Sequence, residues 1–156
     1  MRELNVPRAE LDRLAPIPVL FDALVGEDDG VCVFVKTLTL DDPGVAAQRT
    51  SPRWPHHLPG ELVIGLTGQA ACVALCRLGH IEPSWRGHGV TISHARFSAP
   101  VLLGERFFTR IEIARTRRVL GSLHVNLRYR MWKHDAGGAE IETYRSTQDA
   151  IFFPGS

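Results

Sequence analysis

One segment limits the possible folds of this chain more than any other: residues 60–78, GELVIGLTGQAACVALCRL. Its residues are apolar on nearly every side of a helix, with Glu61, Thr67, Gln69 and Arg77 as the exceptions. A helix of that kind is buried on most sides rather than along one stripe. Its longest uncharged stretch is shorter than the roughly 20 residues of a membrane span. We therefore predict a central helix that the rest of the chain must cover.

Alternating apolar and polar residues predict one strand before this helix and several long strands after it. The first strand covers residues 31–40, and the later strands cover residues 90–101, 105–117, 119–133 and 139–153. Turn sequences at 102–104, 120–122 and 135–138 join the later strands as hairpins. Because hairpin-connected strands pair antiparallel, the sequence predicts an α+β fold in which an antiparallel sheet wraps around one long central helix.

The N-terminal part is less regular. Residues 1–16 are polar and are predicted to form an arm or a frayed helix. Residues 18–25 are predicted to form a short amphipathic helix, which ends at the turn 26–30. With 156 residues, the chain has the length of one ordinary domain. We expect a single domain over residues 1–156, with its core in residues 31–153.

Charge and cysteine usage narrow the range of partners. The chain has 18 Lys and Arg against 17 Asp and Glu, so it lacks the basic footprint of a nucleic-acid-binding protein. The chain has an odd number of cysteines, and their spacing is not that of metal ligands: Cys32, Cys72 and Cys76. This favours buried thiols in a reducing compartment over disulfides or a metal site. The N-terminus does not resemble a signal peptide. We expect a cytoplasmic protein with no nucleic acid or membrane as partner and no bound metal.

A long loop at residues 41–59 precedes the central helix and contains four prolines. Loops longer than about 15 residues in compact domains are commonly functional. This loop also carries the side chains of Arg49, Arg53, Trp54, His56 and His57. We therefore expect the functional site where the loop meets the helix.

The residues around this junction are similar to motifs of hotdog-fold acyl-thioester enzymes. The sequence HLPG at residues 57–60, followed by Gln69, resembles the Pro-Gly helix start and helix Gln of FabZ-type 3-hydroxyacyl dehydratases. The interval from His57 to Gln69 is also that of FcoT-like fatty acyl thioesterases. Farther on, ARFSAPVLLGE at residues 95–105 resembles a strand and turn common to these enzymes. The resemblance implies a hotdog fold, usually dimeric, over residues 31–153.

The chain departs from both subfamilies. FabZ-type dehydratases place a Glu four residues before the helix Gln, where this chain has Gly65. FcoT-like thioesterases carry a Tyr and an Asn where this chain has Ser51 and Pro59. Elimination of a hydroxyl therefore lacks its usual proton donor, whereas hydrolysis needs only a base, a water molecule and an oxyanion hole. This difference favours hydrolysis over dehydration.

The residue types at the helix start suit chemistry on a thioester. The first N–H groups of a helix are unsatisfied donors at the positive end of its dipole, and Gly60 has no Cβ to keep a carbonyl away. Histidine titrates near neutral pH, so His57 or its neighbour His56 suits a general base on water. The expected catalytic residues are His57, Gly60, Gln69 and Glu61, and the expected substrate-binding residues are Arg53, Trp54, His56, Pro59 and Gly65.

Two of these helix residues have alternative interpretations. Glu61, Gly65 and Gln69 are spaced i, i+4 and i+8, so they lie on one helix face. Gly65 either leaves a gap for water or an acyl chain, or allows close packing of helix against sheet. Gln69 either orients water or substrate, or bonds the backbone of a facing protomer.

The sequence thus predicts a homodimeric hydrolase of fatty acyl-CoA or acyl carrier protein thioesters. Coenzyme A or phosphopantetheine enters only as part of the substrate, and no separate cofactor is expected. One alternative is a 3-hydroxyacyl-thioester dehydratase that uses Glu61. A second is addition of an amine such as glycine to an enoyl thioester followed by hydrolysis, with Arg49 or Arg53 holding the carboxylate. A third is a non-catalytic protein that binds acyl ligands.

Overall fold

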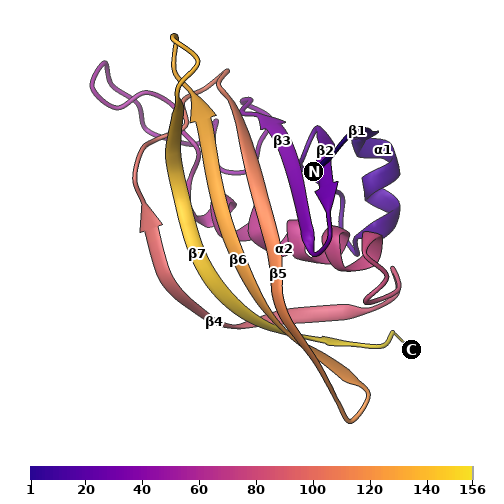
Figure 1. The fold of residues 1–156 in the computed structure, drawn as a ribbon. Helices are drawn as coiled ribbons and strands as arrows, with labels where there is room; N and C mark the ends of the chain where they lie inside the picture. The colour runs from indigo at the N-terminus through magenta and orange to yellow at the C-terminus, as the bar shows by residue number, and fades with distance from the viewer. Residues whose placement is uncertain (156) are drawn as a thin grey trace.

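The computed structural model describes residues 1–155, in which one antiparallel sheet curves around one long helix (Figure 1). The strands are β1 (Arg2–Pro7), β2 (Ala23–Asp28), β3 (Val31–Thr37), β4 (Arg86–Phe97), β5 (Arg106–Val119), β6 (Ser122–His134) and β7 (Glu140–Phe153). The helices are α1 (Arg8–Leu11), a 3₁₀ turn at Asp12–Leu14, and α2 (Gly60–Arg77). The strand order is β1-β2-β3-β5-β6-β7-β4.

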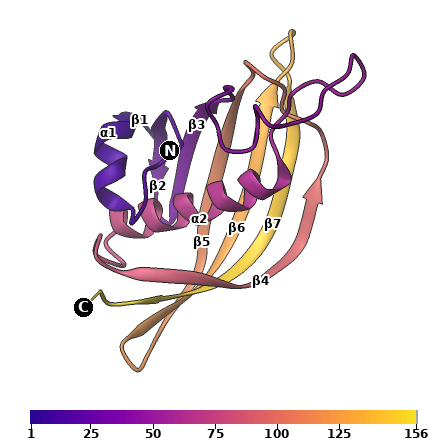
Figure 2. The same ribbon diagram turned by 180° about the vertical axis from the view of Figure 1, so that it is seen from behind.

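Helix α2 follows β3, which lies inside the sheet, and leads to β4 at the far edge. It therefore crosses the concave face of the sheet, as Figure 2 shows. Its end is fixed by a Schellman motif, in which the N–H of His80 bonds the carbonyl of Leu75 at 2.8 Å and Gly79 adopts φ +75°. The predicted helix over residues 60–78 is confirmed.

One face of α2 packs into the sheet and forms the core. The buried residues of this face include Leu62, Leu66, Ala70, Val73 and Ala74. They pack with inward-facing strand residues, among them Phe107, Ile111, Leu127, Met131 and Tyr144. The opposite stripe of Glu61, Ile64, Gly65 and Gly68 is exposed, so the helix is less completely covered than its composition predicts.

Polar groups in the middle of this contact are paired with one another. The buried Tyr129 hydroxyl donates to the backbone carbonyl of Thr67 at 2.9 Å. The amide of Gln148 donates to the Thr67 hydroxyl at 3.0 Å and to the Ser146 hydroxyl at 3.2 Å. Because a buried polar group without a partner is costly, these bonds let polar side chains remain under the helix.

The N-terminal predictions are wrong in two places. Residues 2–7, expected in an arm or frayed helix, pair with β2 as an edge strand. Residues 18–25, expected to be helical, run in an extended path into β2. The reason is the alternation of Val19 and Phe21, which are buried, with Leu20 and Asp22, which are less so. That period of two suits extended chain rather than helix.

The predicted long strands are confirmed, and at two of them a bound shifts by three residues or more. The strand expected at residues 90–101 is β4 at Arg86–Phe97, and the strand expected at 119–133 is β6 at Ser122–His134. Between β5 and β6, Leu120 and Gly121 have φ of +48° and +84°, so both central residues of this two-residue turn are left-handed.

The two edges of the sheet differ. Strand β1 is short, and its Arg2 pairs with Glu27 of β2 at 2.6 Å. Strand β4 is longer, and all of its residues are exposed, including the large apolar side chains of Val90, Ile92 and Phe97. Within residues 1–155, none of the helices combines the length and apolar character needed to cross a membrane.

Candidate active site

The loop between β3 and α2 is held in place by a buried ion pair. Lys36 of β3 and Asp42 of the loop are 1% and 6% exposed, and their Nζ and Oδ1 atoms lie 2.6 Å apart. The other oxygen of Asp42 accepts the N–H of Thr39 at 2.8 Å. These bonds fix the turn that leads into Pro43 and Gly44, which form one wall of the site.

His57 is positioned by its backbone. The side chain of Gln48 accepts the His57 N–H at 2.9 Å and donates to the His57 carbonyl at 2.9 Å. The next N–H, that of Leu58, donates to the carbonyl of Val101 at 2.8 Å. His57 is thus clamped between its own loop and the turn after β4. Gln48 was not among the residues expected from the sequence.

One hydrogen bond orients the ring of His57 and favours one of its tautomers. Its Nδ1 lies 3.0 Å from the carbonyl oxygen of Pro55. Because a carbonyl oxygen only accepts hydrogen bonds, Nδ1 carries the proton in the neutral ring, and Nε2 carries the lone pair. The ring is therefore set up to accept a proton at Nε2.

Helix α2 begins immediately after this histidine. Pro59, with φ −65° and ψ 145°, is the residue before the first helical position, and no side chain of the described part of the chain caps the helix. The N–H groups of Gly60, Glu61 and Leu62 lack hydrogen-bond partners among the described residues. This uncapped turn is the positive end of an 18-residue helix and suits a developing negative charge.

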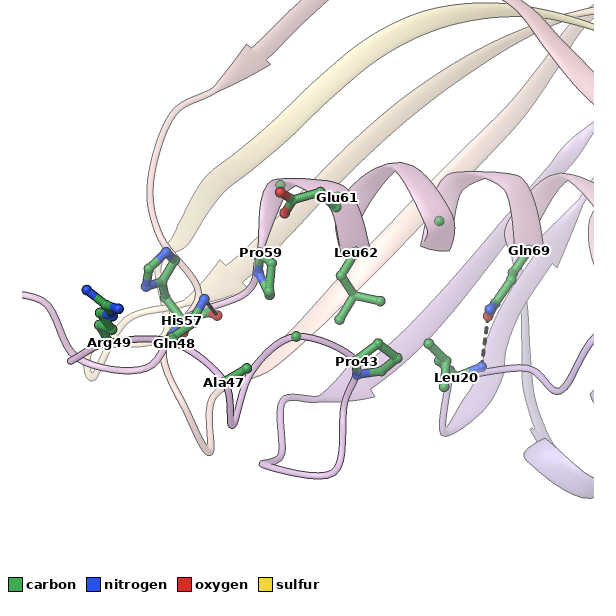
Figure 3. Close-up of a pocket in the computed structure, with 13 residues that line it drawn as sticks. Leu20, Pro43, Ala47, Gln48, Arg49, His57, Pro59, Glu61, Leu62 and Gln69 are labelled. Atoms are coloured by element: carbon green, nitrogen blue, oxygen red, sulfur yellow. Dashed lines mark hydrogen bonds between the residues drawn. The ribbon is translucent and has the colours of Figure 1, made fainter.

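A pocket of about 740 Å³ opens beside the helix start (Figure 3). It brings together six of the nine residues expected from the sequence: His57, Pro59, Gly60, Glu61, Gly65 and Gln69. His57, Gln48 and Arg49 lie at one end in Figure 3, and Gln69 lies at the other beside Leu20. The loop residues Pro43, Gly44 and Ala47 line the side opposite the helix.

Gln69 bonds its own chain. Its Oε1 accepts the N–H of Leu20 at 2.8 Å, while its Nε2 has no hydrogen-bond partner within residues 1–155. The side chain thus ties the segment before β2 to the helix and still lines the pocket. A Cβ added at Gly65 would meet no atom within 4 Å. Gly65 therefore leaves a gap, and packing of helix against sheet does not require a glycine there.

The other three expected residues lie outside the pocket lining. Arg53 and Trp54 are exposed on the outer part of the loop, where Ser51 and Trp54 bond each other's backbone at 2.9 and 3.0 Å. The Nδ1 of His56 lies 2.9 Å from the carbonyl of Val45, so this ring bonds the loop. Of the two neighbouring histidines, the structure places His57 in the pocket.

A second, smaller pocket also adjoins the helix start. It has a volume of about 340 Å³ and shares His57 and Gly60 with the larger pocket. Thr143 and Tyr144 of β7 also line it. Neither residue was expected from the sequence, because both lie more than 80 residues from the helix start along the chain.

The thiols are unsuited to act as nucleophiles. Burial raises the pKa of Cys32 to about 12 and that of Cys76 to about 11, and it also raises the pKa of Cys72. Thiols with such pKa values remain protonated at neutral pH. Within the described part of the chain, no three His, Cys, Asp or Glu side chains are grouped so that they could hold a metal ion.

Comparisons with known proteins identify the fold. No protein-family model matches the sequence, and no curated protein matches it. The structure is similar to the dehydratase heterocomplex ApeI:P from Xenorhabdus doucetiae, with 17% identity, coverage of 99% of this chain and 93% of that chain, and a TM-score of 0.61. It is also similar to a hot-dog-like protein from Thermanaerovibrio acidaminovorans, with 16% identity, coverage of 93% and 88%, and a TM-score of 0.57.

A third similar structure is a hypothetical thioesterase protein with coenzyme A from Streptococcus pneumoniae, with 11% identity, coverage of 84% and 88%, and a TM-score of 0.57. Likeness at these identities shows the fold. The chain has the hotdog fold that its motifs imply, with one sheet wrapped around α2.

Proposed function

We propose that this chain hydrolyses acyl thioesters at the start of α2. The observation that carries the proposal is the shared position of a base and an oxyanion site. His57, with its lone pair on Nε2, lines the same pocket as the uncapped first turn of the helix. The similar hotdog proteins include one described as a thioesterase with coenzyme A.

In the proposed reaction, Nε2 of His57 takes a proton from a water molecule, and the water oxygen forms a bond to the thioester carbonyl carbon. The carbonyl oxygen becomes an oxyanion, which the N–H of Gly60 stabilises. The tetrahedral intermediate then collapses, the carbon–sulfur bond breaks, and the leaving thiolate takes the proton from His57. The products are a carboxylic acid and a free thiol.

The remaining pocket residues have supporting roles in this proposal. Gln48 holds the backbone of His57, so it is a positioning residue. The free amide Nε2 of Gln69 and the carboxylate of Glu61 orient water or substrate. Arg49, which is exposed at the mouth of the pocket, suits the phosphate groups of coenzyme A or of a carrier-bound phosphopantetheine. Free thiols at Cys32, Cys72 and Cys76 suit the reducing cytoplasm.

The second candidate is dehydration of a 3-hydroxyacyl thioester. Two observations favour it: Glu61 lines the same pocket as His57, and one similar structure is a dehydratase heterocomplex. Against it, Gly65 stands at the position of the usual acid. Amine addition to an enoyl thioester and non-catalytic ligand binding are the remaining alternatives.

The test is incubation of the protein with acyl-, enoyl- and 3-hydroxyacyl-CoA of several chain lengths, following free thiol and product mass. Hydrolysis predicts equal amounts of thiol and carboxylic acid. Interconversion of 3-hydroxyacyl and enoyl thioesters without thiol release would replace the proposal with the dehydratase. Consumption of an enoyl thioester only when glycine is present would favour amine addition. Binding without any conversion would favour the non-catalytic role.

We also propose that the protein works as a homodimer that pairs through β4. A long exposed edge strand with apolar side chains invites pairing with another strand. All 12 residues of β4 are exposed, and Val90, Ile92 and Phe97 among them are large and apolar, whereas β1 carries a charged pair at its edge. A second copy of the chain would cover Val90, Ile92 and Phe97 and would continue the sheet.

The oligomeric state can be measured by light scattering during size-exclusion chromatography. We expect a mass of about 35 kDa for the wild-type protein, twice the 17.3 kDa of one chain. Ile92→Lys should shift the mass toward the monomer, because it places a charge on the pairing edge. Leu120→Lys, at an exposed turn between β5 and β6, is the matched control and should stay dimeric. A monomeric wild-type protein would contradict the dimer.

A further inference from the structure

Two elements hold the backbone of His57. Gln48 bonds its N–H and its carbonyl from the loop side, and the two side chains lie together in Figure 3. The other element is the β4–β5 turn, residues 101–105, in which Leu102 forms an antiparallel bridge with His57. One side of His57 is therefore held by a single side chain, and the other side is held by the backbone of a turn.

The β4–β5 turn bonds the residues on either side of His57. The N–H of Leu103 donates to the carbonyl of His56 at 3.1 Å. The N–H of Leu58 donates to the carbonyl of Val101 at 2.8 Å. These two bonds fix the peptide groups before and after His57, and with them the direction in which its ring leaves the backbone. A shift of the turn would therefore change the direction of the ring.

The turn is itself held by one acidic side chain. Oε2 of Glu105 accepts the N–H of Leu102 at 2.7 Å. The same oxygen accepts a hydrogen bond from Nζ of Lys133 at 2.6 Å. Lys133 belongs to β6 and lies opposite Phe107 of β5, and its side chain is 12% exposed. Because the sheet fixes the place of this cation, the carboxylate connects the turn to a rigid support.

The two halves of the turn have different supports. The second half is bonded to the residue after β3, since the N–H of Gly104 donates to the carbonyl of Leu38 at 2.8 Å. In the first half, the N–H of Leu102 has the Glu105 carboxylate as its one partner within residues 1–155. A partly buried N–H without a partner is costly, so this half would move if the carboxylate were removed. The first half is also the part that bonds the residues beside His57.

We propose that Glu105 is a positioning residue for His57, which it holds through the β4–β5 turn, and that Lys133 keeps the carboxylate in place. The inference rests on the proposed function only for the role of His57 as the base. With the turn intact, Nδ1 of the ring stays at the carbonyl of Pro55 and the lone pair stays on Nε2. Without the carboxylate, the first half of the turn shifts, and the ring adopts other orientations and the other tautomer.

The direct test is the tautomer of His57, measured by ¹⁵N NMR of the histidine side chains at about pH 8.5, where histidine rings are neutral. The signal of His57 is the one that His57→Ala removes. Glu105→Ala should lower the ratio of the Nδ1-protonated to the Nε2-protonated form by about three- to tenfold, because the bond to the Pro55 carbonyl is weakened. Glu140→Ala is the matched control, since it breaks another ion pair of β6, with Arg130, and Glu140 lies outside the lining of both pockets.

Thiol release from hexanoyl-CoA gives the second readout. Glu105→Ala should lower kcat by about tenfold and change KM by less than about twofold, because residues 101–105 do not line the larger pocket. Both readouts are taken at a temperature at which the melting curve shows the variant to be folded. A purely structural role of Glu105 would lower the melting temperature and leave both the tautomer ratio and kcat unchanged.

Glu105→Gln is the second variant, because it keeps the shape of the side chain and one acceptor oxygen and is expected to fold. It should change the tautomer ratio and kcat in the same direction as Glu105→Ala, by a smaller amount. A wild-type tautomer ratio or a wild-type kcat in the folded Glu105 variants would overturn the inference, as would an equal change in Glu140→Ala. Absence of thiol release by the wild-type protein would contradict hydrolysis instead, and the tautomer ratio would still decide whether Glu105 positions His57.

Discussion

The contact between α2 and the sheet is closed in its middle and open at its start. In the middle, the hydroxyl of Tyr129 bonds the helix backbone and Gln148 bonds Thr67, so the buried polar groups are paired within the chain. At the start, the buried hydroxyls of Thr143 and Tyr144 lack hydrogen-bond partners among the described residues, and two pockets adjoin the first turn. The same sheet face thus serves as scaffold in one place and as a candidate binding surface in another.

The comparison between the closed middle and the open start separates polar groups that are hydrogen-bonded within the chain from polar groups that are not. In the closed region, a polar side chain stabilises the fold only because a neighbour satisfies it. In the open region, the first N–H groups of α2, which lack partners among the described residues, are suited to a ligand. Substitutions in the closed part should therefore change stability, and substitutions in the open part should change binding and turnover.

The largest stability effect is expected at the ion pair that anchors the wall of the open region. Asp42→Ala leaves the charge of Lys36 buried without its partner and should lower the free energy of unfolding by about 3–5 kcal/mol. Denaturant titration measures this change. Asp41→Ala is the control, because Asp41 is exposed and should cost less than about 0.5 kcal/mol. Equal effects of the two variants would show that the loop is not held by this pair.

Two substitutions, Tyr129→Phe and Tyr144→Phe, together test the comparison between the closed and open regions. Tyr129→Phe removes a hydrogen bond in the closed region and should lower the free energy of unfolding by about 1 kcal/mol. Tyr144→Phe removes a hydroxyl that has no partner within residues 1–155 and should leave stability unchanged or raise it. Thermal unfolding of both variants measures the difference. The reverse order of stability would contradict the division into closed and open regions.

The closed interior also predicts a response to alkaline pH. Burial raises the pKa of Cys32 from 9.0 to about 12, so the folded state keeps a proton that the unfolded state loses above pH 9. The stability contributed by this group is therefore fully present below pH 9 and declines as pH rises from 9 toward 12. We expect a loss of about 1 kcal/mol at pH 10. Cys32→Ala should show a shallower decline, and an unchanged slope would contradict a buried thiol.

The smallest effect is expected at Gly65, on the open face of the helix. A methyl group there meets no atom within 4 Å, and alanine favours helix over glycine, so Gly65→Ala should raise the free energy of unfolding by about 0.5–1 kcal/mol. Gly79→Ala is the contrasting variant, because Gly79 has φ +75° and an alanine there is strained. Destabilisation by Gly65→Ala would show that the open face is packed against something in solution.

Much of the closed region could be predicted from the sequence, because its signals are local. The all-round apolar pattern of residues 60–78 predicted α2, and alternation predicted β5, β6 and β7. The predicted start of β4 was wrong by four residues. All side chains of β4 are exposed in the single chain, so its sequence has no alternation of buried and exposed positions to mark where the strand begins. The helix predicted at residues 18–25 failed because six of its eight residues are apolar, so the pattern fits a period of two as well as a helical period.

The open region could be predicted only where the motif is contiguous in sequence. His57, Pro59 and Gly60 lie together at the loop–helix junction, and the helical period brought Gly65 and Gln69 to the same pocket. The role of Gln48 depends on a bond to a backbone nine residues away, which no local pattern reports. Thr143 and Tyr144 were missed because they reach the site only through the pairing of distant strands and a bulge in β7.

The measurement that tests the central claim most directly is thiol release from acyl-CoA by the wild-type protein and by His57→Ala, with His134→Ala as control. His134 is exposed at the end of β6, so its removal should leave the rate unchanged. We predict that His57→Ala lowers the rate by about 10²–10⁴-fold while its melting temperature stays that of the wild type. Thiol release at the wild-type rate by His57→Ala would contradict hydrolysis by a histidine-activated water at the start of α2.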